Sequence, residues 1–276
     1  MTVTSEIVED ETSKNAKHKL ETEYAWIYDL IYPDFLPRIK KENDILLAAL
    51  KSRENKRILE LGSGSARQSS LLAREGCNVK AIDISPQMTE LAAKRIGKER
   101  VQLGDARNFK TDEPFGAVVI GPLVTCFFLD NKDLKRALEC SYQSLVPGGL
   151  ILCEFIAADF ILTDPFYNGF SKQEFKITNG RITRFNECKL DLHADAKYDW
   201  FSTYIFDLHE GLTIDTDDVL LRAYFASEVS MFLDSVGFNI LGSYGFVENT
   251  QFIGLDTETA KSKKSTLLFL AQKSKV

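Results

Sequence analysis

Short apolar runs alternate with segments of helical periodicity between residues 57 and 155. Five runs have the length and composition of strands and span residues 57–61, 78–83, 100–103, 115–120 and 150–155. Three intervening segments place apolar residues at helical spacing and cover residues 66–75, 85–96 and 131–146. Repeated strand–helix units join parallel strands by right-handed crossovers. The pattern therefore predicts an α/β fold with a doubly wound parallel sheet and helices on both faces.

The pattern changes on both sides of this core. Residues 1–20 are polar without periodicity, which predicts a mobile tail, and helices are expected near residues 24–31 and 38–51. After residue 158 the runs become β-prone, and Asn179-Gly180 between two of them is a strong hairpin signal. We therefore expect a core over 21–158 and 219–276, interrupted by an antiparallel β insertion over 159–218. A helix over 227–235 and strands over 239–244 and 266–271 complete the core.

Composition narrows the class of protein. The chain has 276 residues, is 44% hydrophobic and carries a net charge of -6, which argues against a broad electrostatic grip on nucleic acid. No apolar run approaches the roughly 20 residues of a membrane span, and the first ten residues lack the pattern of a secretory signal. The five cysteines form no CxxC pair and the three histidines lack metal-ligand spacing, so we expect free thiols and no metal site. These features favour a cytoplasmic enzyme.

A glycine-rich turn carries the clearest chemistry. Glu60-Leu-Gly-Ser-Gly64 follows a predicted strand and opens a helix, so its glycines let a ligand approach the backbone and the free N–H groups of the helix start. Asp83 ends the next strand about 20 residues later, where an acid can accept ribose hydroxyls. Nicotinamide-dependent oxidoreductases share this arrangement. Ala66 stands where their fingerprint has a third glycine, which disfavours that class.

Four segments together resemble a known family. They are Glu60-Leu-Gly-Ser-Gly64, Ala81-Ile-Asp-Ile-Ser-Pro-Gln-Met88, Gly104-Asp-Ala106 and Leu145-Val-Pro-Gly-Gly149. In this order and spacing they resemble the motifs of class I S-adenosylmethionine-dependent methyltransferases. The resemblance implies a Rossmann-like sheet of seven strands with the last antiparallel, S-adenosylmethionine as cofactor, and methyl transfer to a nitrogen or oxygen atom of a small-molecule acceptor. A methyltransferase-like protein that binds without catalysis is the alternative from another class.

The resemblance also implies roles for single residues. Asp83 would accept hydrogen bonds from both ribose hydroxyls, and Asp105 would accept one from the adenine amino group. The other cofactor-binding positions would be Glu60, Gly62, Ser63 and Gly64 at the methionine portion, Ile84, Met88 and the Ala106 backbone at the adenine, and Gly121 and Leu123 beside the methyl group. Gly116 departs from the family, in which many relatives carry an acid there. We interpret it as a loss of local structure and not of chemistry.

The flanking segments resemble a subgroup. Ile27-Tyr-Asp-Leu-Ile-Tyr32 is similar to the N-terminal segment of small-molecule methyltransferases, including amino-sugar N-methyltransferases, in which a tyrosine covers the cofactor. Tyr28 occupies that position, although packing alone explains it equally well. The same resemblance suggests that Tyr167, Arg222 and Tyr224 reach the acceptor. The aromatic insertion would act as an acceptor lid or as a homodimer contact. No catalytic residue follows from the sequence: His193 and His209 are more typical of surface positions, and Asp215, Asp217 and Asp218 of a solvated loop.

Overall fold

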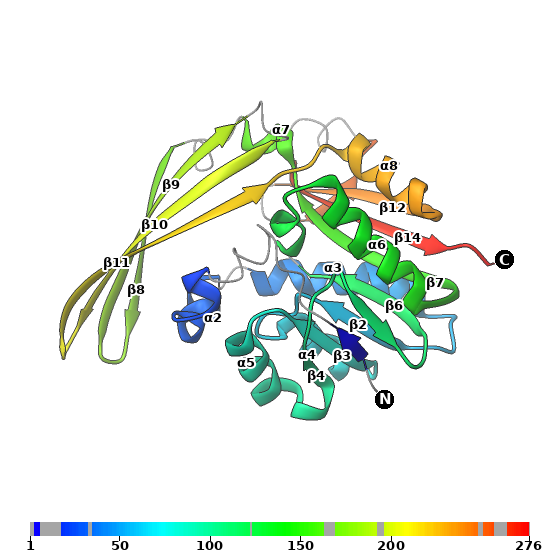
Figure 1. The fold of residues 1–276 in the computed structure, drawn as a ribbon, viewed down its shortest axis with the longest axis horizontal. Helices are drawn as coiled ribbons and strands as arrows, with labels where there is room; N and C mark the ends of the chain where they lie inside the picture. Colours follow the sequence, from blue (N-terminus) through cyan, green and yellow to red (C-terminus); the bar gives the residue numbers. More distant parts are fainter. Residues whose placement is uncertain are drawn as a thin grey trace.

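The computed structural model describes residues 3–5, 18–32, 35–121, 123–162, 169–191, 196–247, 251–256 and 264–275. Its centre is an eight-stranded sheet with the order β13-β12-β14-β7-β6-β2-β3-β4 (Figure 1). The strands are β2 (Arg57–Leu61), β3 (Asn78–Asp83), β4 (Val101–Leu103), β6 (Phe115–Ile120), β7 (Leu145–Ile156), β12 (Phe238–Val247), β13 (Gln251–Gly254) and β14 (Lys264–Lys273). The five strands from β7 to β4 are mutually parallel. No helix among the described residues is long and apolar enough to cross a membrane.

The expected seven strands are all present, and the predicted antiparallel last strand is confirmed because β14 runs antiparallel to β7. Short β13 adds an eighth strand, antiparallel to β12 at the edge of the sheet. Its sequence, Gln251–Gly254, lies in a polar region without a periodic signal, so the pattern does not reveal it.

Helices cover both faces of the sheet. On one face, Leu46 of α3 (Phe35–Leu50) and Leu72 of α4 (Arg67–Arg74) pack on the sheet with the side chain of Ile58. On the other, Leu134 of α6 (Asn131–Ser144) and Leu233 of α8 (Ala226–Val236) pack in a separate core cluster. Helix α5 (Pro86–Ile96) begins at Ser85, whose side chain accepts a hydrogen bond from the Met88 N–H as an N-cap. The shorter helical elements are α2 (Tyr28–Ile31), α7 (Ala158–Ile161) and 3-10 turns at Lys19–Glu21, Ala25–Ile27, Lys98–Arg100 and Val124–Phe127.

Gly116 does not mark a loss of local structure, and that interpretation was wrong. It lies inside the fully buried strand β6, where the pairing with β7 shifts register between Phe115 and Ala117. A Cβ atom at Gly116 would lie 2.0 Å from the backbone oxygen of Asn55. The absent side chain therefore lets the segment before β2 pass directly over β6.

The insertion forms a separate four-stranded antiparallel sheet with the order β11-β10-β9-β8. Its strands are β8 (Phe170–Ile177), β9 (Gly180–Asp191), β10 (Lys197–Leu208) and β11 (Gly211–Arg222), so the sheet runs four residues past the expected end at 218. The hairpin at Asn179-Gly180 is confirmed, since Ile177 pairs with Gly180. Figure 1 shows this long sheet standing beside the core, with α2 between the two.

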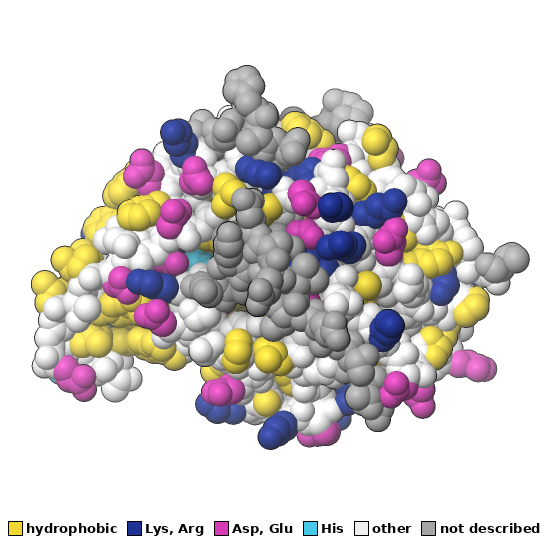
Figure 2. All heavy atoms as spheres, in the orientation of Figure 1, with side chains coloured by type: hydrophobic (Ala, Val, Ile, Leu, Met, Phe, Trp, Pro, Cys, Tyr) yellow, Lys and Arg dark blue, Asp and Glu magenta, His cyan; other side chains and the backbone are white. Residues whose placement is uncertain are grey.

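The two faces of the insertion differ in exposure. Alternate residues of β10 are buried, as expected for a sheet with one covered face. Phe170, Leu212 and Ile214 point outward and are more than 60% exposed. In Figure 2, hydrophobic side chains gather over this part of the molecule.

Parts of residues 1–20 do not have the structure expected of a tail. Val3–Ser5 forms β1 and pairs with β5 (Phe109–Thr111). His18 and Leu20 are buried, because Leu20 enters an apolar cluster with Ile182 and Phe206 of the insertion. Residues 6–17 lie outside the described residues.

Candidate functional site

A cavity of about 850 Å³ lies between the carboxyl ends of the parallel strands and the inner face of the insertion. Its volume is near the upper end of the roughly 300–1,000 Å³ found for ligand pockets, so more than one small molecule can fit. The core side is lined by Gly62, Gly64, Asp83, Ile84, Gly104, Asp105, Ala106, Arg107, Leu123, Val124 and Cys126. The insertion contributes Gln173, Arg184, Tyr198, Trp200, Val219 and Leu221. The position matches the edge at which open α/β sheets bind ligands.

The glycine turn presents backbone to this cavity. Gly62 has a φ of +65° and a Cβ atom there would lie 2.4 Å from the Val124 side chain, so a side chain cannot be accommodated. Gly64 has a φ of +52° and faces the ring of Tyr28 across 3.8 Å. Ala66 also takes a left-handed conformation, directly before α4. The turn therefore keeps its shape although its third fingerprint position is not glycine.

Asp83 joins the turn to the second strand. One carboxylate oxygen accepts from the Gly64 N–H at 2.6 Å, and the other accepts from the Ser85 N–H at 2.9 Å. Burial raises the pKa of Asp83 to about 6 despite these hydrogen bonds. Glu21, which also lines the cavity, has its pKa raised to about 8 by burial and by the charges of Asp83 and Asp217. The cavity thus holds two acids that share a buried environment.

Glu60 and Ser63 lie beside the main cavity. Both line an adjoining hollow of about 30 Å³, which shares Tyr28, Gly62 and Gly64 with the larger space. The Glu60 carboxylate is buried, accepts hydrogen bonds from the backbone N–H (2.9 Å) and hydroxyl of Ser69, and has its pKa raised to about 7 by burial. Glu60 therefore links β2 to the first turn of α4 behind the glycines.

Asp105 lines the cavity, and its carboxylate is already paired with Arg107. Its carboxylate accepts from the Arg107 N–H at 2.8 Å and pairs with the Arg107 guanidinium at 2.8 Å, and that guanidinium also pairs with Asp133 at 3.0 Å. A ligand amino group at Asp105 would have to share the carboxylate with Arg107.

The other expected cofactor positions fall into two groups. Ile84, Ala106 and Leu123 line the cavity. Met88 is buried and contributes to packing, and it is not among the residues that line the cavity. Gly121 lies behind the glycine turn, where a Cβ atom would approach the Gly62 carbonyl oxygen to 3.2 Å.

Residues 18–32 close the cavity from the side. Tyr28 lines it, with the Arg67 guanidinium 5.6 Å from its ring centre. Asp29 accepts from the Ser65 hydroxyl at 2.6 Å and pairs with Arg95, which fixes the segment to the glycine turn and to α5. The Glu21 carbonyl oxygen accepts from the Ser85 hydroxyl at 2.5 Å.

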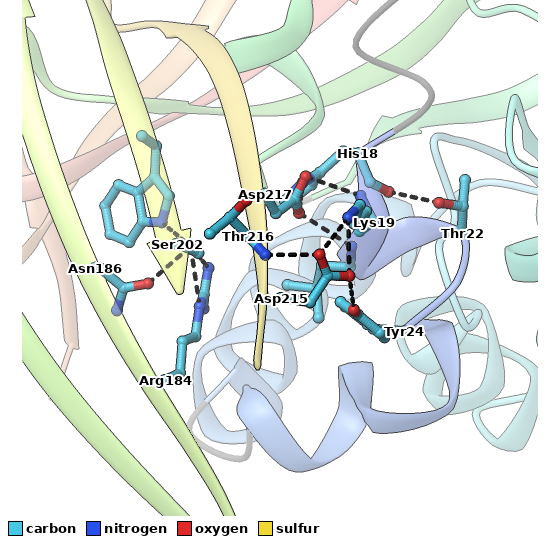
Figure 3. Close-up of polar contacts among 12 residues, drawn as sticks. His18, Lys19, Thr22, Tyr24, Arg184, Asn186, Ser202, Asp215, Thr216 and Asp217 are labelled. Carbon is cyan, nitrogen blue, oxygen red and sulfur yellow. Dashed lines mark hydrogen bonds and ion pairs between the residues drawn. The ribbon is translucent and has the colours of Figure 1, made fainter. Parts of the chain in front are cut away.

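The same segment is attached to the insertion (Figure 3). His18 Nδ1 lies 2.5 Å from Asp217, whose carboxylate also accepts from the backbone N–H groups of Lys19 (3.1 Å) and Leu20 (3.3 Å). Lys19 and Tyr24 bind Asp215. Two of the acids expected in a solvated loop therefore lie on strand β11 and hold the N-terminal segment.

Two of the residues expected to reach the methyl acceptor do not line the cavity. Arg222 is buried, pairs with Glu228 and donates to Asn131 at 2.7 Å. Tyr224 is buried under Arg222, and its hydroxyl donates to the Phe128 carbonyl oxygen at 2.7 Å. Both serve packing at the base of the insertion, so the structure does not support an acceptor contact for either. Tyr167 and His193 lie outside the described residues.

The sequence reasoning missed the insertion's polar inner row and the His18–Asp217 pair. The alternation of β9 and β10 indicates that Arg184, Trp200 and Ser202 share one face of a sheet. It does not indicate that this face is the inner one. His18 and Asp217 are almost 200 residues apart, and no local signal connects them.

The buried acids predict how stability depends on pH in the ligand-free protein. Glu21, Glu60 and Asp83 have folded-state pKa values of about 8, 7 and 6, whereas unfolded Glu and Asp titrate at about 4.3 and 3.9. The folded state binds more protons between these limits, so stability is full below about pH 4 and falls as the pH rises toward 8. Chemical denaturation between pH 5 and 8.5 should show this fall.

Glu60→Gln is the matched control. A glutamine oxygen can still accept from Ser69 but does not ionise, so the variant should lose part of the slope, on the order of 3 kcal/mol over the window. Identical pH slopes in the variant and the wild type would show that Glu60 does not carry this penalty.

Comparison with known proteins shows which proteins this chain resembles. Residues 58–149 match the family described as "Methyltransferase domain". A dTDP-4-amino-2,3,4,6-tetradeoxy-D-glucose N,N-dimethyltransferase from Saccharopolyspora spinosa is 24% identical over 54% of this chain and 59% of its own length. A demethylmenaquinone methyltransferase from Tropheryma whipplei is 33% identical over 36% of this chain and 41% of its own length. The chain thus spans less than two thirds of these relatives.

Solved structures extend the likeness to nearly the whole chain. DesVI from Streptomyces venezuelae has a TM-score of 0.70 at 19% identity and covers 91% of this chain and 98% of its own. The sugar N-methyltransferase KedS8 from Streptoalloteichus has a TM-score of 0.72 at 16% identity and covers 99% of both chains. At these identities the likeness shows the fold. The match to the methyltransferase domain covers residues 58–149, so it describes the parallel part of the core and not the insertion.

Proposed function

We propose that the protein transfers a methyl group from S-adenosylmethionine to the amino nitrogen of a small-molecule acceptor, with an amino sugar as the favoured class. The single observation behind this is a cavity with two different ends. One end consists of a glycine turn and Asp83, and the other of aromatic and polar side chains of the insertion. The matches to sugar N,N-dimethyltransferases favour the amino-sugar class. The glycine turn alone would also suit a nicotinamide cofactor, which the family match disfavours.

The residues present fit the cofactor. The Asp83 carboxylate lies in the cavity and has acceptor capacity beyond its hydrogen bonds to the backbone, as a ribose diol requires. Ile84, Ala106 and Leu123 supply apolar surface near Asp105 for an adenine ring. Glu60 and Ser63 line the small hollow behind the glycines, where the methionine portion would end. The cofactor supplies an activated methyl group, so the protein's task is alignment and exclusion of water.

The acceptor end belongs to the insertion. Tyr198, Trp200 and Val219 line it and lie on adjacent strands with their side chains on one face. Phe160 also lines the cavity, whereas Phe170 and Phe201 are exposed on the outer face. Residues 159–218 are therefore proposed to act as the acceptor lid through their inner face.

His18 is the group best placed to take the proton that leaves an amine. It lines the cavity, Asp217 holds its Nδ1, and Nε2 has no hydrogen-bond partner within the described residues. A carboxylate that fixes one ring nitrogen leaves the other as an acceptor, which is the arrangement of a positioned general base.

The cofactor assignment can be tested by calorimetric titration. The wild type should bind S-adenosylmethionine and S-adenosylhomocysteine and not NAD. Asp83→Ala should weaken binding about ten- to a hundred-fold, because a charge-assisted hydrogen bond is worth roughly 1.5–3 kcal/mol. Asp105→Asn should cost less, since Arg107 already engages that carboxylate. Unchanged affinity in folded Asp83→Ala would remove Asp83 from the site.

The acceptor wall can be tested with neighbouring residues of one strand. Trp200→Ala should raise the KM for an amino-sugar acceptor about tenfold or more, because it removes a large apolar surface from the cavity, and should leave cofactor affinity unchanged. Phe201→Ala is the control, since its side chain lies on the opposite face and is 40% exposed. Equal kinetics of the two variants would place the acceptor elsewhere.

The base can be tested by its pH profile. His18→Gln should lower kcat about a hundred-fold, within the range for a lost general base, and should remove the fall in kcat at acidic pH. Asp217→Asn should act in the same direction. Asp215→Asn is the control, because it removes a neighbouring attachment of the same segment without touching His18. A wild-type pH profile in His18→Gln would show that water accepts the proton.

A further inference from the structure

A buried network of three charged side chains borders the cavity at Asp105. The Arg107 guanidinium lies between two carboxylates: its Nη2 group is 2.8 Å from Asp105, and its Nη1 group is 3.0 Å from Asp133. All three side chains are at most 7% exposed. Asp105 and Arg107 line the cavity, whereas Asp133 belongs to the first turn of α6 and does not line it. The proposed function uses only Asp105, so the other two charged groups have no role in it.

Arg107 holds both oxygens of the Asp105 carboxylate. Oδ1 accepts from the Arg107 backbone N–H at 2.8 Å and from Nε at 3.0 Å, and Oδ2 accepts from Nη2 at 2.8 Å. Because the backbone group and the planar guanidinium fork both bind, a rotation of the carboxylate would break at least one contact. The turn is also fixed, since the Asn108 N–H donates to the Asp105 carbonyl oxygen at 3.1 Å. Asp105 therefore presents one orientation to the cavity.

Asp133 holds the guanidinium through its other terminal nitrogen. The Asp133 backbone N–H donates to the N-cap residue Asp130 at 2.8 Å, which anchors Asp133 in the first turn of α6. An acidic side chain is also favourable at the N-terminus of a helix. The Arg107 carbonyl oxygen accepts from Cys140 Sγ of the same helix at 3.4 Å. Arg107 is thus attached to α6 at two points and cannot follow a movement of Asp105 freely.

A fixed carboxylate distinguishes hydrogen-bond donors from acceptors. An ionised carboxylate only accepts hydrogen bonds, so it matches the amino group of adenine and opposes the oxygen that hypoxanthine carries at the same position. Hypoxanthine has an N–H at the neighbouring ring atom, and a carboxylate able to turn would accept from that group instead. Selection between the two bases therefore depends on how firmly the acid is held, and not only on its presence.

We propose that Arg107, held by Asp133, is a positioning residue that makes the proposed cofactor site selective for a 6-amino purine over a 6-oxo purine. The inference rests on the proposed methyltransferase function and adds a role for two residues to it. Arg107 acts through Asp105 and need not touch the base. Without the guanidinium, Asp105 would be able to accept from either base, so selectivity would fall although the carboxylate remained.

The test is calorimetric titration of the full chain with S-adenosylhomocysteine and with S-inosylhomocysteine, which differ only in the base. The wild type should bind S-adenosylhomocysteine at least about tenfold more tightly, as expected for a hydrogen bond to a charged group. In Arg107→Gln this preference should fall to about threefold or less, because the adenine ligand binds more weakly and the hypoxanthine ligand does not. Arg107→Lys should lie between the two, since it keeps the charge without the fork.

The ratio of the two affinities is a readout that a merely structural role would not move. A variant that only loosened the site would weaken both ligands by the same factor. Arg57→Gln is the matched control, because it removes an arginine–glutamate pair, Arg57 with Glu113, outside the cavity, so its ratio should equal that of the wild type. The proposal is overturned if the wild type does not distinguish the two ligands, or if folded Arg107→Gln keeps the wild-type ratio.

A second variant decides the question if Arg107→Gln does not fold, since removing one partner from a buried ion network is costly. Asp133→Asn keeps an oxygen that can accept from Nη1 but removes the charge that holds Arg107, so the preference should fall by less than in Arg107→Gln. An unchanged ratio in both Asp133→Asn and Arg107→Lys would also overturn the proposal. Absence of S-adenosylhomocysteine binding in the wild type would refute the methyltransferase function itself, whereas normal binding with unchanged ratios would refute only the role of Arg107.

Discussion

The carboxylate of Asp217 joins the two halves of the site. It binds His18 and the backbone N–H groups of Lys19 and Leu20, so strand β11 of the insertion holds the start of the N-terminal segment. The same segment reaches the glycine turn through Asp29 and Ser65, and the start of α5 through Glu21 and Ser85. The cavity is therefore closed by a segment that belongs to neither sheet, and its walls are positioned only when all three parts meet.

Apolar packing and buried charge act in opposite directions around this junction. Leu20, Ile27 and Ile31 bury their side chains against Ile182 and Phe206, which favours the closed arrangement. The nearby acids Glu21, Glu60 and Asp83 have raised pKa values because burial disfavours their charged forms. Buried polar groups that lower the stability of the ligand-free protein are common at sites where a bound ligand supplies their hydrogen-bond partners.

Local patterns made the core predictable, and long-range contacts limited the rest. The glycine turn and Asp83 are recognisable because strand, turn and acid follow one another within about 20 residues. The pairing of His18 with Asp217 and the placement of Arg184 in the cavity depend on how two sheets dock, which no window of sequence contains. Arg222 and Tyr224 show the converse, since their chemistry suits an acceptor but the fold directs them into packing. Asp105 lines the cavity, whereas its pairing with Arg107, only two residues away, was not predicted.

The two ends of the cavity present different groups to a ligand, backbone at one end and side chains at the other. The glycine turn relies on backbone, since Gly62 and Gly64 take left-handed conformations and leave no room for specificity by side chains. The insertion presents side chains from alternate positions of four paired strands, so one substitution changes one point of its inner face while the backbone pairing persists. Acceptor choice can therefore vary without disturbing the glycine turn.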